Sequence, residues 1–361
     1  MIDASPSIFL GDSPSINLIV KLPGTRCNLQ CDYCFEKRKS ISNPQDGFVS
    51  TQQIEKFIQH SESPINLVFH GGEPLLAPPS FFREMLNSLR LQKNRIKSVQ
   101  IQTNGTLLSQ DLIDVFWKEF SDYSIEIAIS LDGDETMNAL RVSQGKESFS
   151  QVMQAFQLLE KNGISAGVLS VIHRNSLPMY KAFIDFISSI PNIKFLKLNP
   201  LHLLSDDGSL LPNSISPSEF AYFVINLFNC YVNSKLYERF PIEPCLSIIQ
   251  RLSGCDTHYC NYSNRKCTNF ICLYPNGTMS LCDSLPYDGF LFTELQEKQS
   301  VAKSIVPLLD VCCTCDLLDF CQGGCLGIRF SMMESEHLQK DYCLSKRILH
   351  DFFIGFIGED K

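Results

Sequence analysis

The chain carries near its start the run Cys27-Asn-Leu-Gln-Cys31-Asp-Tyr-Cys34, a C-x3-C-x2-C spacing. Iron–sulfur clusters that only transfer electrons give every iron a protein ligand, usually a cysteine thiolate. Three cysteines leave one iron of a four-iron cluster open to a small molecule. The alternatives are a zinc site or three unrelated core cysteines, but zinc ligands usually form a C-x2-C pair with a distant second pair. The spacing therefore indicates a cluster that also binds a small ligand.

Short apolar runs alternate with helical periodicity from residue 16 to about residue 201. Alternating β and α units predict a parallel sheet, and six units make an open, partial (β/α)6 barrel instead of the closed eight-stranded form. The strands are expected at 16–22, 65–70, 98–103, 125–131, 165–172 and 194–199. Helices are expected at 52–60, 111–120 and 149–161, with start signals at Ser50 or Thr51, Ser109 and Ser148.

Polar and glycine-rich turns follow four successive strands of this pattern. Such turns are common for steric reasons alone. However, the carboxyl ends of parallel strands meet at one edge, where barrel enzymes carry their active sites, so four in succession predict one site. The turns are the cysteine run, His70-Gly-Gly-Glu-Pro74, Gln102-Thr-Asn-Gly-Thr106 and Ser130-Leu-Asp-Gly133.

Together these motifs resemble those of the radical SAM enzymes, which use S-adenosyl-L-methionine (SAM), and the resemblance covers almost the whole chain. It implies an oxidoreductase in which Cys27, Cys31 and Cys34 hold a [4Fe-4S] cluster whose open iron binds the amino and carboxylate groups of SAM. The other SAM-binding residues that it implies are Tyr33 for the adenine, Gly71, Gly72 and Glu73 for the amino group, Ser130 and Asp132 for the carboxylate and ribose, Arg141 for the carboxylate, and Asn104.

Two of these assignments have plainer alternatives. A guanidinium binds a carboxylate through two parallel hydrogen bonds, which suits Arg141 to its role, but an arginine on the surface is the alternative. Asp132 directly precedes Gly133 and is alternatively a turn residue.

The C-terminal part of the chain holds a second group of cysteines. Its first half is Cys267-x9-Gly277-x4-Cys282, and its second half is Cys312-x2-Cys315-x5-Cys321-x3-Cys325 followed by Cys343. This spacing resembles that of the seven-cysteine SPASM domain, which binds two auxiliary [4Fe-4S] clusters. One of the two clusters needs an additional ligand from an upstream cysteine. Cys260 has the expected spacing for this ligand, and Cys255 and Cys272 are the alternatives. Two zinc ribbons are the alternative for the whole tail. The ligands implied by the resemblance are Cys312, Cys315, Cys321 and Cys343 for one cluster, and Cys267, Cys282, Cys325 and the upstream cysteine for the other.

These patterns divide the chain into four parts. The first strand begins near Ile16, which leaves no room for an N-terminal domain that recognises a leader peptide. The expected parts are an N-terminal segment at 1–15, the radical SAM partial barrel at 16–235, the SPASM domain with its upstream connector at 236–345, and a C-terminal helix or tail at 346–361.

Asp283, directly after Cys282, is the candidate catalytic residue. In sulfatase-maturing relatives an aspartate at this place takes a proton from the substrate side chain, and a carboxylate suits a general base. The alternative is that Asp283 only accepts a hydrogen bond from a backbone amide.

Proteins with a SPASM domain mostly modify peptides or proteins. Two features favour a maturase that forms an oxidative cross-link, a carbon–carbon cyclophane or a thioether, in a ribosomally made precursor peptide. His70 stands where sulfatase maturases more often have glutamine, and the segment from Asp134 to Phe149 resembles that of cross-linking enzymes. An anaerobic sulfatase maturase, which converts cysteine or serine to formylglycine, is the alternative. The non-enzymatic alternative is a zinc-binding interaction protein.

Composition limits the partners. The 361 residues carry a formal net charge of −8 and no basic stripe, so nucleic acid is not expected as a partner. No apolar stretch is long enough to span a membrane, and no signal peptide is evident, which predicts the cytoplasm. Sixteen cysteines in a reducing compartment indicate metal binding or catalysis. The expected partners are a peptide or protein substrate, an electron donor such as flavodoxin or ferredoxin, and a separate leader-binding protein.

Overall fold

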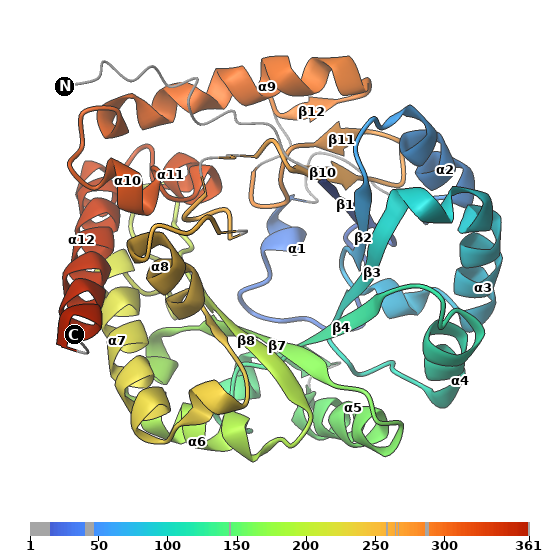
Figure 1. Ribbon diagram of the computed structural model, residues 1–361, viewed down its shortest axis with the longest axis horizontal. Helices are drawn as coiled ribbons and strands as arrows, with labels where there is room; N and C mark the ends of the chain where they lie inside the picture. The colour runs from blue at the N-terminus through green and yellow to red at the C-terminus, as the bar shows by residue number, and fades with distance from the viewer. Residues whose placement is uncertain are drawn as a thin grey trace.

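The computed structural model describes residues 15–39, 47–143, 146–257, 259–263, 265, 267–285 and 289–359. Apart from Ser15, the N-terminal segment expected at 1–15 lies outside these residues. Gly145, within the segment from Asp134 to Phe149 that resembles cross-linking enzymes, lies outside them as well. Figure 1 shows a curved sheet with helices around its outer side, and the short helix α1 (Phe35–Lys39) on its inner side.

One ten-stranded sheet runs through the described residues, in the order β12-β11-β10-β1-β2-β3-β4-β7-β8-β9. The six predicted strands are the central ones from β1 to β8, all paired in parallel, which confirms the α/β fold with an open parallel sheet. Two further parallel strands, β9 and β10, extend this sheet at either side. The strands are β1 (Ile16–Lys21), β2 (Ile65–His70), β3 (Ile96–Thr103), β4 (Ile125–Ser130), β7 (Ala166–Ile172), β8 (Ile193–Pro200), β9 (Ile242–Glu243), β10 (Phe270–Leu273), β11 (Met279–Ser280) and β12 (Leu291–Phe292), with β5 (Val142–Ser143) and β6 (Lys146–Glu147) forming a separate pair.

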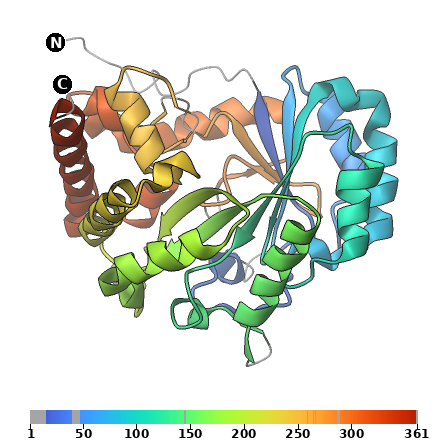
Figure 2. The same cartoon turned by 60° about the horizontal axis from the view of Figure 1, so that its bottom comes forward.

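The helices between the strands pack on the sheet because their apolar residues recur at helical spacing. In α5 the buried residues are Val152, Ala155, Phe156 and Leu159, at i, i+3, i+4 and i+7. Figure 2 shows how this layer covers the outer side of the sheet. The helices of the barrel are α2 (Thr51–His60), α3 (Pro79–Ser88), α4 (Gln110–Ile113), α5 (Phe149–Lys161), α6 (Tyr180–Ser189) and α7 (Pro217–Asn233).

Of the serines predicted to begin helices, those before α2 and α4 cap their helices, whereas the one before α5 does not. Ser50 caps α2 in a reciprocal capping box with Gln53, so of the two predicted residues Ser50 is the cap. Ser109 caps α4, which continues as a π-helical turn to Glu119. Ser148 precedes α5 but makes no capping bond, because its hydroxyl donates to the carbonyl oxygen of Arg141.

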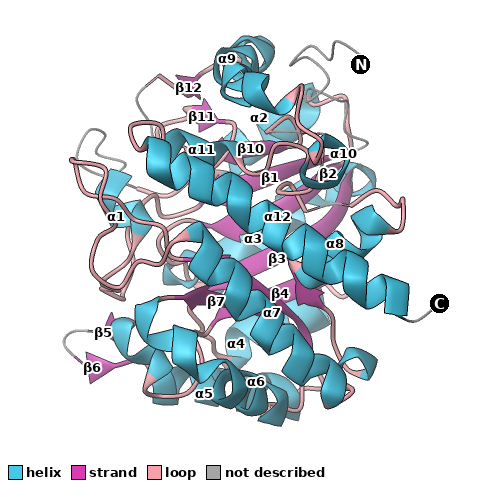
Figure 3. Ribbon diagram, turned by 90° about the vertical axis from the view of Figure 1, so that its left-hand side faces the viewer, coloured by secondary structure: helices cyan, strands magenta, loops and turns pink. Residues whose placement is uncertain are grey.

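The cysteine-rich tail is built onto the same sheet, since β10 pairs with β1. Its longest helix, α12, lies along α7 (Figure 3), and Phe353 of α12 packs on Phe228 of α7 with ring centres 4.7 Å apart. This helix runs without a break through position 345, where the SPASM part was expected to end. The tail helices are α8 (Cys245–Leu252), α9 (Lys298–Ile305), α10 (Leu318–Cys321), α11 (Leu326–Ser331) and α12 (Glu336–Glu359). Among the described residues, no helix is both long and apolar enough to cross a membrane.

Candidate active site

The cysteine loop leaves the end of β1 and leads into α1. Cys27 accepts hydrogen bonds at its sulfur from the Leu29 amide (3.3 Å) and the Asn104 side chain (3.6 Å). Its charge interacts with that of Cys31, which in turn interacts with that of Cys34, so the three thiols lie close together. Burial raises the pKa of the Cys27 thiol to about 11 and also raises that of Cys31. Because the thiolate is the form that binds a metal, metal binding at Cys27 and Cys31 must overcome this rise in pKa.

The turn after β2 lies directly against this loop. The Gly72 amide donates to the Gly24 carbonyl (2.8 Å), and the Glu73 amide donates to the Arg26 carbonyl (2.9 Å). A Cβ atom at Gly72 would lie 2.0 Å from the Arg26 carbonyl oxygen, and Gly71 has a φ of +122°. Both positions therefore require glycine.

Replacing Gly72 by alanine is expected to lower the free energy of unfolding by about 1–3 kcal/mol or more, because the clash is with backbone. Unfolding by denaturant measures this change in the free energy of unfolding. The matched control is Gly355→Ala in α12, where a Cβ meets nothing within 4 Å and should stabilise the helix by about 0.5–1 kcal/mol. A Gly72→Ala variant as stable as the wild type would contradict the close approach of the two loops.

The Glu73 carboxylate is fully buried beneath this turn. It accepts hydrogen bonds from the Leu75 amide (2.9 Å), the Thr103 hydroxyl (2.7 Å) and the Asn104 amide (2.7 Å). Burial raises the pKa of its carboxyl above the ordinary value. A carboxylate offers about four acceptor positions, so one remains for a ligand.

Asn104, at the end of β3, joins the same edge. Its side-chain nitrogen donates to Asn28 (2.9 Å) as well as to Cys27, and its oxygen accepts from Thr106. The third predicted strand end thus holds the cysteine loop in position through side chains.

The fourth strand end forms a buried polar group with the cysteine loop. The Tyr33 hydroxyl donates to the Asp132 carboxylate, and the Arg141 guanidinium donates to the Tyr33 hydroxyl (2.7 Å). Asp132 also accepts from the Val171 amide (2.9 Å), and Ser130 is half-buried at the end of β4. Arg141 is 6% exposed, which excludes the alternative of a surface arginine. Its Nε atom is buried and has no hydrogen-bond partner among the described residues, so it remains a donor for an anionic ligand.

Lys21, the last residue of β1, forms a charge network that the sequence did not predict. It is fully buried, and its ammonium donates to Glu36 of α1, to His70 at the end of β2 (3.1 Å) and to Asp283 (3.4 Å). Burial disfavours the charged ammonium, but the carboxylates of Glu36 and Asp283 outweigh it and raise the pKa of Lys21 above its ordinary value. The only signal in the sequence was a lysine that directly follows the apolar run at 18–20 at the end of the strand.

A metal ion could in principle bridge the three acceptors of this network. The ligand atoms of Glu36, His70 and Asp283 lie within 4.8 Å of one another. The Lys21 ammonium already bonds to all three, so a cation of the chain itself fills this role.

The tail brings its cysteines together as two groups. Cys282, which precedes Asp283, interacts electrostatically with Cys267, Cys272 and Cys325. Of the candidates for the upstream ligand, Cys260 lies with Cys325 near Tyr259, Cys255 is exposed, and Cys272 is buried within β10. In the second group, Cys312 interacts with Cys315, Cys321 and Cys343.

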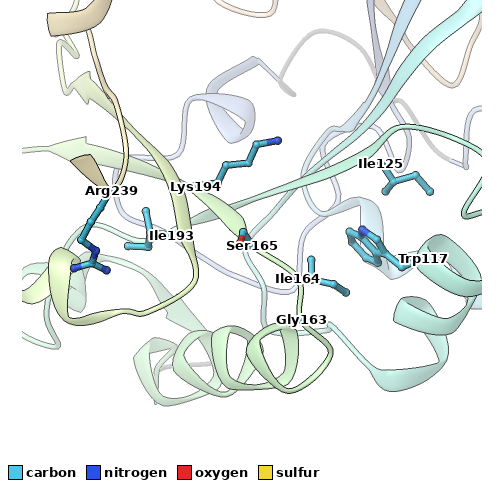
Figure 4. Close-up of a pocket in the computed structure, with 8 residues that line it drawn as sticks. All are labelled: Trp117, Ile125, Gly163, Ile164, Ser165, Ile193, Lys194 and Arg239. Atoms are coloured by element: carbon cyan, nitrogen blue, oxygen red, sulfur yellow. The ribbon is translucent and has the colours of Figure 1, made fainter. Parts of the chain in front are cut away.

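One hollow among the described residues lies away from this chemistry. It has a volume of about 540 Å³ and opens where β4, β7 and β8 begin, between Trp117, Lys194 and Arg239 (Figure 4). Because the cysteine loop lies at the carboxyl ends of the strands, this hollow is at the opposite edge of the sheet. It belongs to the packing of the barrel base.

Comparison with known proteins identifies the class of the chain's N-terminal part. Residues 22–187 match the model of the radical SAM superfamily, and these residues are a radical SAM domain, so the protein is an enzyme of that chemistry. A cysteine-type anaerobic sulfatase-maturating enzyme of Clostridium perfringens (strain 13 / Type A) is 24% identical over 94% of this chain and 96% of its own length. A serine-type anaerobic sulfatase-maturating enzyme of Bacteroides thetaiotaomicron is 26% identical, over 87% of this chain and 83% of its own.

Solved structures share the fold. The structure of native anSMEcpe with bound AdoMet superimposes with a TM-score of 0.79, at 23% identity, over 96% of this chain and all of that one. A further structure of anSMEcpe contains AdoMet and the Cp18Cys peptide, and has the same TM-score at 22% identity.

These relatives correct one expectation. A cross-linking maturase was expected partly because His70 stands where glutamine is usual, and that expectation is wrong: relatives that match over most of their length are sulfatase-maturating enzymes of both types. The physical reason is that His70 bonds to Lys21, so its identity reflects the charge network and does not report the substrate.

Proposed function

We propose that this chain is an anaerobic sulfatase maturase, which oxidises a cysteine or serine side chain of a sulfatase to formylglycine. The observation that carries the proposal is the match to a sulfatase-maturating enzyme over 94% of this chain and 96% of the relative. The ion pair between the buried Lys21 and the partly buried Asp283, next to Cys282, supports it, because the reaction needs a base at the substrate.

The residues present fit a SAM-binding cluster. We assign its three protein ligands to Cys27, Cys31 and Cys34, whose thiols lie close together beside the ends of the strands. The unpartnered Nε of Arg141 suits the SAM carboxylate, since guanidinium binds carboxylates strongly. The remaining SAM-binding residues in this proposal are Tyr33, Gly71, Gly72, Glu73, Asn104, Ser130 and Asp132.

The tail is proposed as a SPASM domain with two auxiliary clusters. Their ligands are the two cysteine groups, with Cys260 as the fourth ligand beside Cys267, Cys282 and Cys325. When bound, SAM and its cluster supply the 5′-deoxyadenosyl radical that removes a hydrogen atom from the substrate carbon, and the auxiliary clusters supply an electron acceptor. The second group is Cys312, Cys315, Cys321 and Cys343.

The chain's own residues then handle the proton. We assign Asp283 as the base that accepts the proton from the substrate thiol or hydroxyl, so that loss of a hydrogen atom, a proton and an electron completes a two-electron oxidation. Serine gives the aldehyde directly, whereas cysteine gives a thioaldehyde that water hydrolyses to the aldehyde with release of hydrogen sulfide. Lys21 orients the Asp283 carboxylate through an ion pair in which the two groups lie 3.4 Å apart. The Lys21 side chain is itself fixed by Glu36 and His70.

Replacing Lys21 by methionine tests this positioning role. Loss of the ammonium leaves Glu36 as an unpaired buried charge, so the free energy of unfolding is expected to fall by about 3–5 kcal/mol. The aldehyde formed per SAM cleaved is expected to fall as well, because Asp283 loses its cation. Thermal unfolding and the ratio of aldehyde to 5′-deoxyadenosine measure the two effects.

The double variant Lys21→Met/Glu36→Gln separates stability from positioning. It removes both buried charges, so stability should recover while the yield of aldehyde per SAM cleaved stays low. If the double variant had the wild-type ratio of aldehyde to 5′-deoxyadenosine, the role of Lys21 would be only to neutralise Glu36.

The proposed activity is tested with two peptides that carry a sulfatase motif, one with cysteine and one with serine at the target position. Anaerobically prepared enzyme, SAM and a reductant are added, and the products are treated with a hydrazine. A hydrazine-reactive aldehyde on either peptide supports the proposal and gives the enzyme's type. SAM cleavage that leaves both peptides unchanged would overturn it. A flavodoxin or ferredoxin of the same cell, and a location in the cytoplasm, complete the proposal.

A further inference from the structure

Two cations of the tail are buried and have no acidic partner within the part of the chain that the structure describes. Arg329 of α11 is 5% exposed and Lys346 of α12 is 7% exposed. Among the described residues, neither forms an ion pair with a carboxylate; their contacts are with sulfur, a carbonyl and aromatic rings. A buried charge without a counter-charge is strongly unfavourable, so negative charge is expected close to both.

Arg329 is aimed at the second cysteine group. Its Nη2 donates to the Cys343 sulfur (3.6 Å), and its charge interacts with those of Cys312 and Cys343. Its Nε donates to the Gly323 carbonyl (2.5 Å), and the guanidinium lies 5.3 Å from the centre of the Tyr342 ring. These contacts hold the side chain in one orientation toward the sulfur.

Lys346 lies between the two cysteine groups. Its ammonium is 4.4 Å from the centre of the Tyr262 ring, and it interacts with the charges of Cys321, Cys325 and Cys260. Cys321 belongs to one group, and Cys325 and Cys260 to the other. Lys346 therefore affects both groups, whereas Arg329 bonds to a sulfur of only one.

A four-iron cluster with four thiolates is an anion, and reduction adds a further negative charge. A fixed cation and an N–H···S hydrogen bond both stabilise the reduced form, so both raise the reduction potential. The effect is largest for the cluster that the donor touches, because buried charges are weakly screened.

We propose that Arg329 raises the reduction potential of the auxiliary cluster on Cys312, Cys315, Cys321 and Cys343 above the value that its cysteines alone would give. This inference rests on the proposed function, which assigns two clusters to the tail. Arg329 acts here through the Cys343 ligand and does not touch the substrate.

The test is a redox titration of the fully loaded enzyme, followed by electron paramagnetic resonance, for the wild type, R329Q and R329K. In R329Q one auxiliary cluster should be reduced only at a lower potential than in the wild type. At the wild-type midpoint potential of this cluster, the ratio of reduced to oxidised cluster should fall at least tenfold. A tenfold fall corresponds to 59 mV for a one-electron couple. R329K keeps the charge but loses the forked donor, so its decrease should be smaller. The matched control is R83Q, since Arg83 of α3 is exposed and paired with Glu119; no shift is expected.

Unchanged auxiliary midpoints in R329Q, with iron content equal to that of the wild type, would overturn the inference and leave the proposed function standing. If R329Q loses iron, the midpoint potential of R329K is used instead. An auxiliary midpoint potential in R329K equal to that of the wild type would equally overturn the inference. A wild-type enzyme that holds iron for a single cluster would overturn the assignment of the tail clusters, and this inference with it.

Discussion

Replacing Cys27, Cys31 and Cys34 together by alanine is expected to reduce SAM cleavage to the level seen without enzyme. The three thiols are the proposed protein ligands of the cluster that binds SAM, and the chain offers no other sulfur in this loop. The tail cysteines lie outside the loop and should keep their clusters. Iron content should therefore fall by about one third from roughly twelve irons per chain, the number for three four-iron clusters.

The readout is 5′-deoxyadenosine formed in the presence of a strong reductant, with iron and sulfide measured on the same sample. Cys230→Ala is the matched control, because Cys230 is a partly buried cysteine of α7 and not one of the proposed ligands. Persistent SAM cleavage in the triple variant would refute the assignment of the site. Zinc in place of iron in the wild type would refute the radical chemistry altogether.

Replacing Asp283 by asparagine is expected to lower aldehyde formation by roughly 10²–10⁴-fold, the usual contribution of a general base. Asparagine has nearly the same shape and can still accept a hydrogen bond from Lys21, but it cannot take up the proton. SAM cleavage should continue, because the SAM-binding residues are unchanged. Product and 5′-deoxyadenosine are therefore measured together, and their ratio should fall.

Asp316→Asn is the matched control for this change. Asp316 also follows a cysteine of the tail, Cys315, but its carboxylate is exposed and pairs with Arg347. This variant should form aldehyde at the wild-type rate. Full turnover by Asp283→Asn would exclude Asp283 as the base and leave it a structural role beside Lys21.

Much of this architecture follows from local sequence signals. The strand predicted at 65–70 is β2 itself, and the helix predicted at 149–161 is α5, because a short apolar run and helical spacing are local properties. The cysteine loop and three glycine-containing turns were predicted to form one site because each follows a predicted strand. Parallel strands bring their carboxyl ends to one edge of the sheet, so these turns lie together.

Contacts between distant segments were not predictable in this way. Lys21 and Asp283 are 262 residues apart, and nothing near either residue indicates the other. The pairing of β10 with β1, which brings Asp283 to the barrel, depends on the tertiary fold. The choice of substrate class failed for a related reason, since His70 was interpreted without its partner Lys21.

The most direct test of the account uses a sulfatase-motif peptide that carries deuterium on the β-carbon of its target cysteine or serine. After anaerobic turnover, mass spectrometry follows both the peptide and 5′-deoxyadenosine. The account predicts deuterium in 5′-deoxyadenosine and a hydrazine-reactive aldehyde at the labelled residue. Unlabelled 5′-deoxyadenosine, or a labelled residue joined to another side chain without an aldehyde, would contradict it.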